Sequence, residues 1–315
     1  MSLAVPTSEQ VLESLKNFVR YELRDTQKIV STVKAGILDE RDELPCLGIT
    51  PISELVSTIY NDNLISITRD YYLSLIAKGY TIDEVKRTLH EKLVSLKALF
   101  SVNTASLKWN MLNSDYNVQC WDLDIGREAL DAPLADSEFL SFIQVPLSLK
   151  SFYQIENPII PTLYKEISFI ELLDYIYEEI KKFSVFPTTW RDQQKPVSLD
   201  NLPAIGIFVQ EPDEDKLEQT STEKTQVTIV FRIYSSLASR EIAFINHMRN
   251  VETVKAWIFK NTILDGCVSS FDLTSLDYGV DFHSKTFQNN PDVPEMPIFR
   301  TDITTVAMLQ NFKEG

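Results

Sequence analysis

Apolar residues recur at helical spacing near the start of each half of the chain. They are Val11, Leu12, Leu15, Phe18, Val19 and Leu23 in the first half, and Phe169, Leu172, Leu173, Ile176, Ile180 and Phe183 in the second. Apolar side chains three and four residues apart form one face of an amphipathic helix. We therefore predict that each half begins with a helix that packs against a core.

A short strand pattern occurs twice, once in each half. Residues 43–52 read ELPCLGITPI and residues 201–210 read NLPAIGIFVQ, so a Leu-Pro-x-apolar-Gly-Ile core is repeated. The predicted strands span 44–50 and 202–209, and a second strand follows each of them, at 64–77 and 225–235. In the last of these, alternation predicts one mainly apolar face, formed by Val227, Ile229, Phe231 and Ile233.

A long helix and two more strands complete each half. The helices are predicted at 81–100, where Thr81 and Glu84 have the spacing of a capping box, and at 239–261, where Ile242, Ile245, Met248, Val251 and Val254 are expected to be buried. The closing strands are predicted at 107–124, 139–152, 271–288 and 298–312.

The order helix–strand–strand–helix–strand–strand therefore occurs twice. We predict an α+β protein made of two tandem repeats, each a sheet packed against helices. The first repeat spans 1–152, a linker with two prolines spans 153–166, and the second repeat spans 167–315. A length of 315 residues agrees with about two domains of roughly 150 residues each.

Charge and cysteine content narrow the class of protein. The net charge of −15 argues against a basic nucleic-acid-binding domain. It is explained either by solubility or by a surface that repels DNA or meets a basic partner. The three cysteines, Cys46, Cys120 and Cys267, are odd in number and widely spaced, which favours reduced thiols. We find no apolar run long enough for a membrane span and no pattern of a secretion signal at the N-terminus.

The sequence offers no constellation for catalysis. Phosphate-binding glycine motifs and the nucleophile elbow are absent from it, and no Cys or His pair has metal-ligand spacing. We therefore predict no catalytic residue, no bound metal and no cofactor, and hence no enzyme. The isolated His90, His247 and His283 are expected to be structural. Asp122, Asp124 and Glu128 could bind a divalent cation, but a solvated strand end fits their pattern better.

Two features are candidates for contacts with other proteins. The polar stretch 211–225, EPDEDKLEQTSTEKT, falls where a hairpin loop is expected. It is either a solvated loop or an interaction loop that orders against a neighbouring subunit or lines a charged opening. Trp190 and Arg191 have the composition of an interface anchor, although core packing is the default for aromatic residues. The candidate loop residues are Glu211, Asp213, Glu214, Asp215, Lys216, Glu218 and Glu223.

The predicted unit resembles the bacteriophage tail terminator, or tail-completion, proteins. The resemblance is carried by residues 202–209 (LPAIGIFV) and by the alternating, Thr-rich strand at 298–309 (IFRTDITTVAML). Residues 44–50 and 139–150 match the family pattern more loosely, and residues 49–63 depart from it. Known members usually carry one such unit per chain, so two units in one chain are a departure.

The resemblance implies a structural virion protein at the head-proximal end of a viral tail. It would form a homo-oligomeric ring that caps the tail tube, joins the tail to a neck or head-completion protein, contacts the sheath where a tail has one, and lets DNA pass without specific binding. It would assemble in the host cytoplasm. Strong divergence between the repeats favours six chains over a pseudo-six-fold ring of three. The alternatives are another neck or tail adaptor, a terminator of a contractile injection system, or, from another class, a duplicated α+β enzyme or small-molecule-binding protein.

Overall fold

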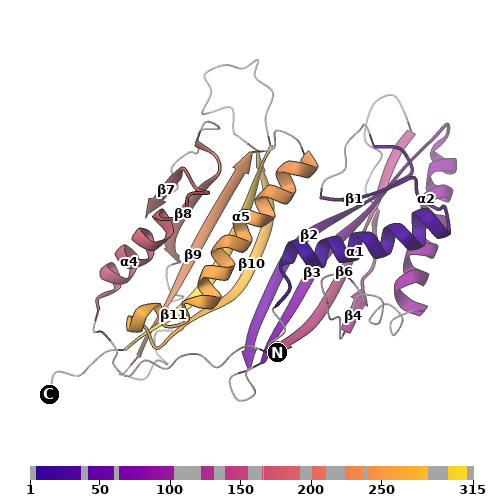
Figure 1. The fold of residues 1–315 in the computed structure, drawn as a ribbon. Helices are drawn as coiled ribbons and strands as arrows, with labels where there is room; N and C mark the ends of the chain where they lie inside the picture. The colour runs from indigo at the N-terminus through magenta and orange to yellow at the C-terminus, as the bar shows by residue number, and fades with distance from the viewer. Residues whose placement is uncertain are drawn as a thin grey trace. The chain divides into compact units, whose positions relative to one another are not determined.

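The computed structural model describes residues 5–36, 42–59, 64–102, 122–130, 139–154, 165, 167–191, 201–210, 224–236, 240–282 and 297–310 (Figure 1). The chain forms two compact units, Met1–Ile155 (unit 1) and Glu156–Gly315 (unit 2), and the division falls inside the predicted linker. Helices pack against a mixed sheet, so the predicted α+β class is confirmed. Among the described helices, none combines the length and apolarity needed to cross a membrane.

Unit 1 contains helices and a set of strands that pair both in parallel and antiparallel. Its helices are α1 (Ser8–Val19), the π-helix η1 (Arg20–Thr26) that continues α1, and α2 (Ile82–Val102). Its strands are β1 (Thr32–Ala35), β2 (Cys46–Ile59), β3 (Leu64–Gly79), β4 (Asp122–Ile125), β5 (Ala129–Leu130) and β6 (Phe139–Gln154). β1 pairs with β2 in parallel, and the order β2–β3–β6–β4 continues through antiparallel pairs. β5 also pairs with β6.

Unit 2 contains α4 (Phe169–Lys181), β7 (Thr188–Arg191), β8 (Ala204–Gln210), β9 (Lys224–Ser236), α5 (Arg240–Lys260), the 3-10 turn η4 (Leu264–Gly266), β10 (Ser270–Phe282) and β11 (Pro297–Gln310). β7 pairs with β8 in parallel, and the order β8–β9–β11–β10 continues through antiparallel pairs.

The same pairing order therefore occurs in both units. In each, a four-residue parallel strand precedes the repeated Leu-Pro motif, and both Leu-Pro bonds, Leu44–Pro45 and Leu202–Pro203, are cis. In each, the last strand lies between the strand that precedes the long helix and the strand that follows it. The short strands β1 and β7 were not predicted from the sequence. An origin by tandem duplication remains a prediction, which the shared order supports.

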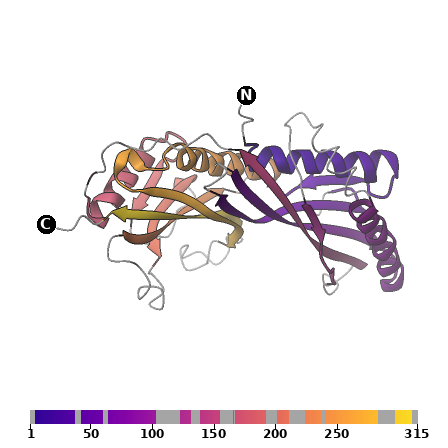
Figure 2. The ribbon, with the colours of Figure 1, turned by 90° about the horizontal axis from the view of Figure 1, so that it is seen from below.

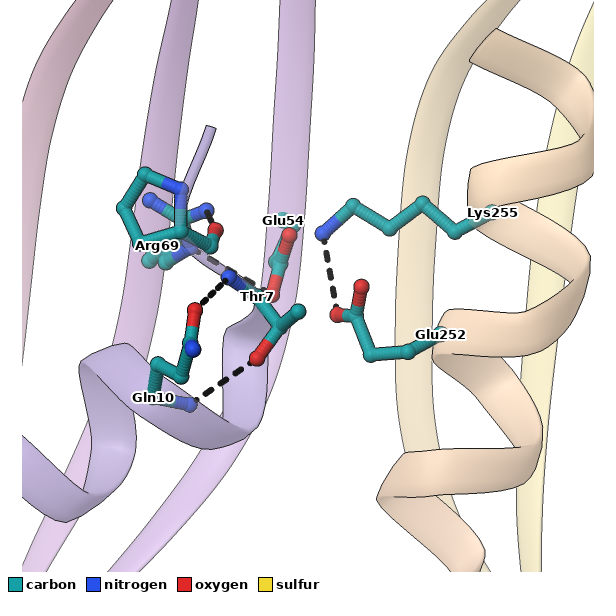
Figure 3. A network of polar contacts seen from close by, with 7 residues as sticks. Thr7, Gln10, Glu54, Arg69, Glu252 and Lys255 are labelled. Atoms are coloured by element: carbon teal, nitrogen blue, oxygen red, sulfur yellow. Dashed lines mark hydrogen bonds and ion pairs between the residues drawn. The ribbon is translucent and has the colours of Figure 1, made fainter. Parts of the chain in front are cut away.

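The N-terminal helix of each unit begins with a capping box. In α1, the Thr7 hydroxyl accepts from the Gln10 amide (3.1 Å), and the Gln10 side chain accepts from the Thr7 amide (2.9 Å; Figure 3). Ser168 and Glu171 do the same at α4. These contacts satisfy amide donors that the first helical turn leaves without partners. At α2 the predicted box forms only in part, because Glu84 accepts from the amide of Tyr80 and not from that of Thr81.

The core of unit 1 contains a buried ion pair. Arg69 Nε on β3 lies 3.5 Å from Glu54 Oε1 on β2, and the two side chains are 1% and 3% exposed (Figure 3). Arg69 also donates to the carbonyl of Pro6, just before α1 (3.4 Å). Tyr71 on the same face of β3 is buried, and burial raises the pKa of its hydroxyl. The pair links the two central strands to the start of the first helix.

In unit 2, α5 covers one face of the strands (Figure 2). Phe231, Trp257 and Phe271 meet edge to face, at centroid distances of 6.0 to 6.3 Å. The predicted buried stripe of α5 was wrong at its start, because Ile242 is 65% exposed. The helix instead turns Phe244 and His247 inward, so the stripe is offset by two residues there. Further along α5, the buried Lys255, whose side chain is 2% exposed, pairs with Glu252 (3.4 Å; Figure 3).

Candidate functional site

The strands of unit 2 have a second face, turned away from α4 and α5, which we call the outer face. Alternation along β9 buries Ile229, Phe231 and Ile233 against the helices and places Arg232 and Tyr234 on the outer face. The outer-face residues used below are Trp190, Phe208, Tyr234, Arg232, Asp277, Arg300 and Asp302.

An ion pair lies at the middle of the outer face. Arg232 on β9 is directly opposite Asp302 on β11, and its guanidinium donates to both carboxylate oxygens (2.6 and 2.8 Å). The side chains are 16% and 17% exposed, and the hydrogen bonds that Arg232 donates to Asp302 raise the pKa of Arg232 above its ordinary value. Arg232 also lies over the ring of Phe208, 4.9 Å from its centroid. A bidentate pair with a stacked guanidinium fixes both side chains in one geometry.

Arg300 and Asp277 extend this cluster across β11 and β10. Arg300 Nε lies 3.9 Å from Asp302 Oδ2. Partial burial, followed by the negative charge of Asp302, raises the pKa of Asp277, while Arg300 opposes that rise. The result is a cluster of two arginines and two aspartates on three adjacent strands, in which Asp277 lies directly opposite Asp302 and the formal charges sum to zero.

The predicted anchor Trp190 lies at the β7 end of the same face. It is half-buried and stacks on Tyr234, with centroids 6.1 Å apart and ring planes 20° apart. Its ring reaches Tyr234 across Gly206, and a Cβ built on Gly206 would come within 2.6 Å of Trp190 Nε1. Gly206, the glycine of the repeated motif, therefore lets the indole lie flat on the strands.

Arg191, the second predicted anchor, points to the other face. It forms an ion pair with Asp174 on α4. The structure thus separates the two anchors: Trp190 belongs to the outer face, and Arg191 ties β7 to the helix. Whether either contacts another protein remains a prediction.

A polar network occupies the opposite, helix-covered face of the same strands. His247 on α5 is 1% exposed. Its Nδ1 lies 2.9 Å from the Ser235 hydroxyl on β9, and its Nε2 lies 2.7 Å from the Thr301 hydroxyl on β11. Its ring stacks on Phe299. Burial lowers the pKa of His247 to about 3, so the imidazole is neutral and one nitrogen donates while the other accepts.

The other residues singled out from the sequence have separate positions. All seven candidate loop residues, 211–223, lie outside the described residues, as do His283 and Cys120. Asp122 and Asp124 are exposed on β4, and Glu128 follows that strand and pairs with Lys97. His90 is exposed on α2. Cys46 and Cys267 are buried free thiols, and burial raises the pKa of Cys46 to about 11.

The outer face is suited to contact with a protein surface. Its groups are planar rings, guanidinium groups and carboxylates, held in place by one another. Among the described residues, no group of three or more His, Cys, Asp or Glu is arranged to hold a metal ion. Alternation in the sequence implies that Arg232 and Tyr234 lie opposite the predicted apolar face of this strand, but the pairing of Arg232 with Asp302 follows only from the register between β9 and β11.

Comparison with known proteins adds no family to this description. No protein-family model matches the chain, and no curated protein matches it.

Proposed function

We propose that the protein is a structural component of a viral tail that assembles as a ring and caps the head-proximal end of the tail tube. The sequence resemblance to tail terminator proteins motivates the proposal. The observation that carries it is the outer face of unit 2. There, the Arg232–Asp302 pair and the Trp190–Tyr234 stack form a preorganised, partly exposed surface on a sheet.

Preorganisation is what such a surface needs for tight association. Side chains that are already fixed lose little conformational freedom when a partner binds. Tryptophan, tyrosine and arginine are also the residues enriched where binding energy concentrates. The outer face supplies all three types within three consecutive strands, with Trp190 on β7 and Tyr234 and Arg232 on β9, and β8 between them.

The repeated strand order gives further support. Two units of the same order in one chain give a ring two related layers, one of which is free to bind the tube while the other binds a neck or sheath protein. Differences between the outer face of unit 2 and the equivalent positions of unit 1 fit such a division. At the positions opposite the motif glycines, unit 1 has Lys34 facing Gly48 where unit 2 has Trp190 facing Gly206.

Capping can be tested with the tail tube protein of the same virus. Purified tube protein is polymerised alone and with increasing amounts of this chain, and tube lengths are measured by electron microscopy. We expect shorter tubes with added density at one end. Tubes of unchanged length and with bare ends at saturating protein would overturn the proposal.

A further inference from the structure

A stripe of basic residues follows the helix at the N-terminus of unit 1. Arg20 and Arg24 are four residues apart on the π-helix η1, and Lys28 lies just past its C-cap residue Gln27, with a φ of 55°. All three are exposed, and Tyr21 beside them is 62% exposed. Because residues four apart on a helix lie on the same side, Arg20 and Arg24 share one side of η1. We call Arg20, Tyr21, Arg24 and Lys28 the basic stripe.

The backbone that carries the basic stripe is held by contacts with the rest of unit 1. Leu23, on the opposite side of η1, is fully buried. The carbonyl of Leu23 accepts from the amide of Ile29 (2.7 Å). Lys92 of α2 donates to the carbonyl of Ile29. Because these contacts hold the end of the helix, the exposed side chains project from a fixed backbone.

The charges of the stripe are poorly compensated within the chain. Arg20 and Lys28 form no ion pair with any residue that the structure describes, and Arg24 reaches only Asp25, at 3.9 Å with both side chains half exposed. Like charges at this spacing repel each other. In a chain of net charge −15, residues 20–28 carry three cations and two carboxylates, Glu22 and Asp25, so this segment has a net charge of +1 beside an exposed tyrosine. Such a surface attracts an acidic partner.

The chain itself contains a partner of that chemistry. Residues 211–215 read EPDED, so four of five positions are acidic. We propose that the basic stripe of one copy binds the acidic stretch 211–215 of a second copy. This inference rests on the proposed ring, because it describes the contact between neighbouring chains. DNA is a less suitable partner for the basic stripe than the acidic stretch, since the negative net charge of the chain opposes binding to a phosphate backbone.

Charge reversal on each side tests the contact. The stripe variant is R20E/R24E, the loop variant is D213K/E214K, and the control is K86E/R87E, which changes two exposed cations on α2. Circular dichroism first establishes that each variant is folded. Self-association is then measured by sedimentation velocity. We expect the stripe variant and the loop variant each to weaken association by roughly tenfold or more, since two partly exposed pairs are lost. The control should associate like wild type.

Mixing the two reversed variants identifies the chain that supplies the acidic stretch. In an equimolar mixture, the acidic stripe of one variant meets the basic loop of the other, and the remaining stripe and loop are unchanged. Association should therefore recover in the mixture, although each variant alone associates more weakly than wild type. If the acidic stretch instead binds the stripe of its own chain, mixing cannot restore association, because within each variant the stripe and the stretch carry charges of the same sign.

The outcomes separate this inference from the proposed function. If wild type forms rings and R20E/R24E forms them equally well, the stripe contact is wrong and the ring stands. The contact is also wrong if both variants are weakened but their mixture does not recover. If wild type remains monomeric at every concentration, both proposals fail.

Discussion

Acid should destabilise unit 2 through one residue, His247. Its imidazole is buried between the hydroxyls of Ser235 and Thr301, and burial lowers its pKa to about 3 from the ordinary value of 6.5. Above pH 6.5 neither the folded nor the unfolded chain holds a proton on this group. Between pH 6.5 and about 3 the unfolded chain takes up the proton and the folded chain does not, so stability falls as the pH falls.

The size of the effect follows from the shift. Each pH unit inside this window costs about 1.4 kcal/mol of unfolding free energy. Between pH 6.5 and pH 4.5 the loss attributable to His247 is therefore about 3 kcal/mol, a large part of the roughly 5–15 kcal/mol that stabilises a typical domain.

The assay compares wild type with H247Q, since glutamine keeps a neutral hydrogen-bonding side chain that does not titrate. Urea unfolding is followed by circular dichroism at several pH values from 7.5 to 4.5. Carboxylates contribute equally to both proteins, so the difference between their pH slopes isolates the imidazole. The wild-type midpoint should fall by on the order of 1 M urea more than that of H247Q. H90Q, which changes the exposed histidine of α2, serves as the control. Equal pH slopes for wild type and H247Q would refute the reasoning.

Two further substitutions test the outer face of unit 2. G206A should destabilise the protein by roughly 1–3 kcal/mol, because the added Cβ falls 2.6 Å from Trp190 Nε1 and displaces the indole. G279A is its control, since the nearest atoms there are 3.8 Å away, and equal thermal stability of the two variants would contradict the packing described. D302N should cost roughly 1–3 kcal/mol by leaving the half-buried Arg232 without its charged partner; a urea midpoint unchanged from wild type would show that the pair contributes nothing.

Much of the fold follows from hydrophobic periodicity. The strong alternation of Val227, Ile229, Phe231 and Ile233 predicted β9 to within a residue at each end, because one face of that strand packs on α5 while the other stays polar. The long helices at 82–102 and 240–260 were also predicted closely.

The sequence predictions missed or misplaced those features of the fold whose hydrophobic patterns are weak. β1 and β7 are only four residues long and half-buried, so they carry no clear period of two. Ile242 was expected in the core because it fits a helical spacing, yet the helix turns Phe244 and His247 inward. The polar His247 is accepted there because two hydroxyls on neighbouring strands satisfy it, which no local pattern reveals.

The arrangement of the candidate site could not be predicted from the sequence, because its side chains meet only through the register of the paired strands. Trp190 stood out by its residue type, but its stacking on Tyr234 requires β7, β8 and β9 to lie side by side with a glycine between the rings. Arg232 and Asp302 are 70 residues apart in sequence. Composition can show that such groups exist, whereas only the pairing of strands shows that they meet.

The most direct test of the proposed ring is the mass of the assembled protein, measured by native mass spectrometry together with electron-microscopy class averages. The account predicts a closed ring of six chains, about 217 kDa from six times the 36.1 kDa chain. A ring of three chains, about 108 kDa, would keep the ring but contradict the six-chain arrangement. A 36.1 kDa monomer at every concentration tested would contradict the central claim.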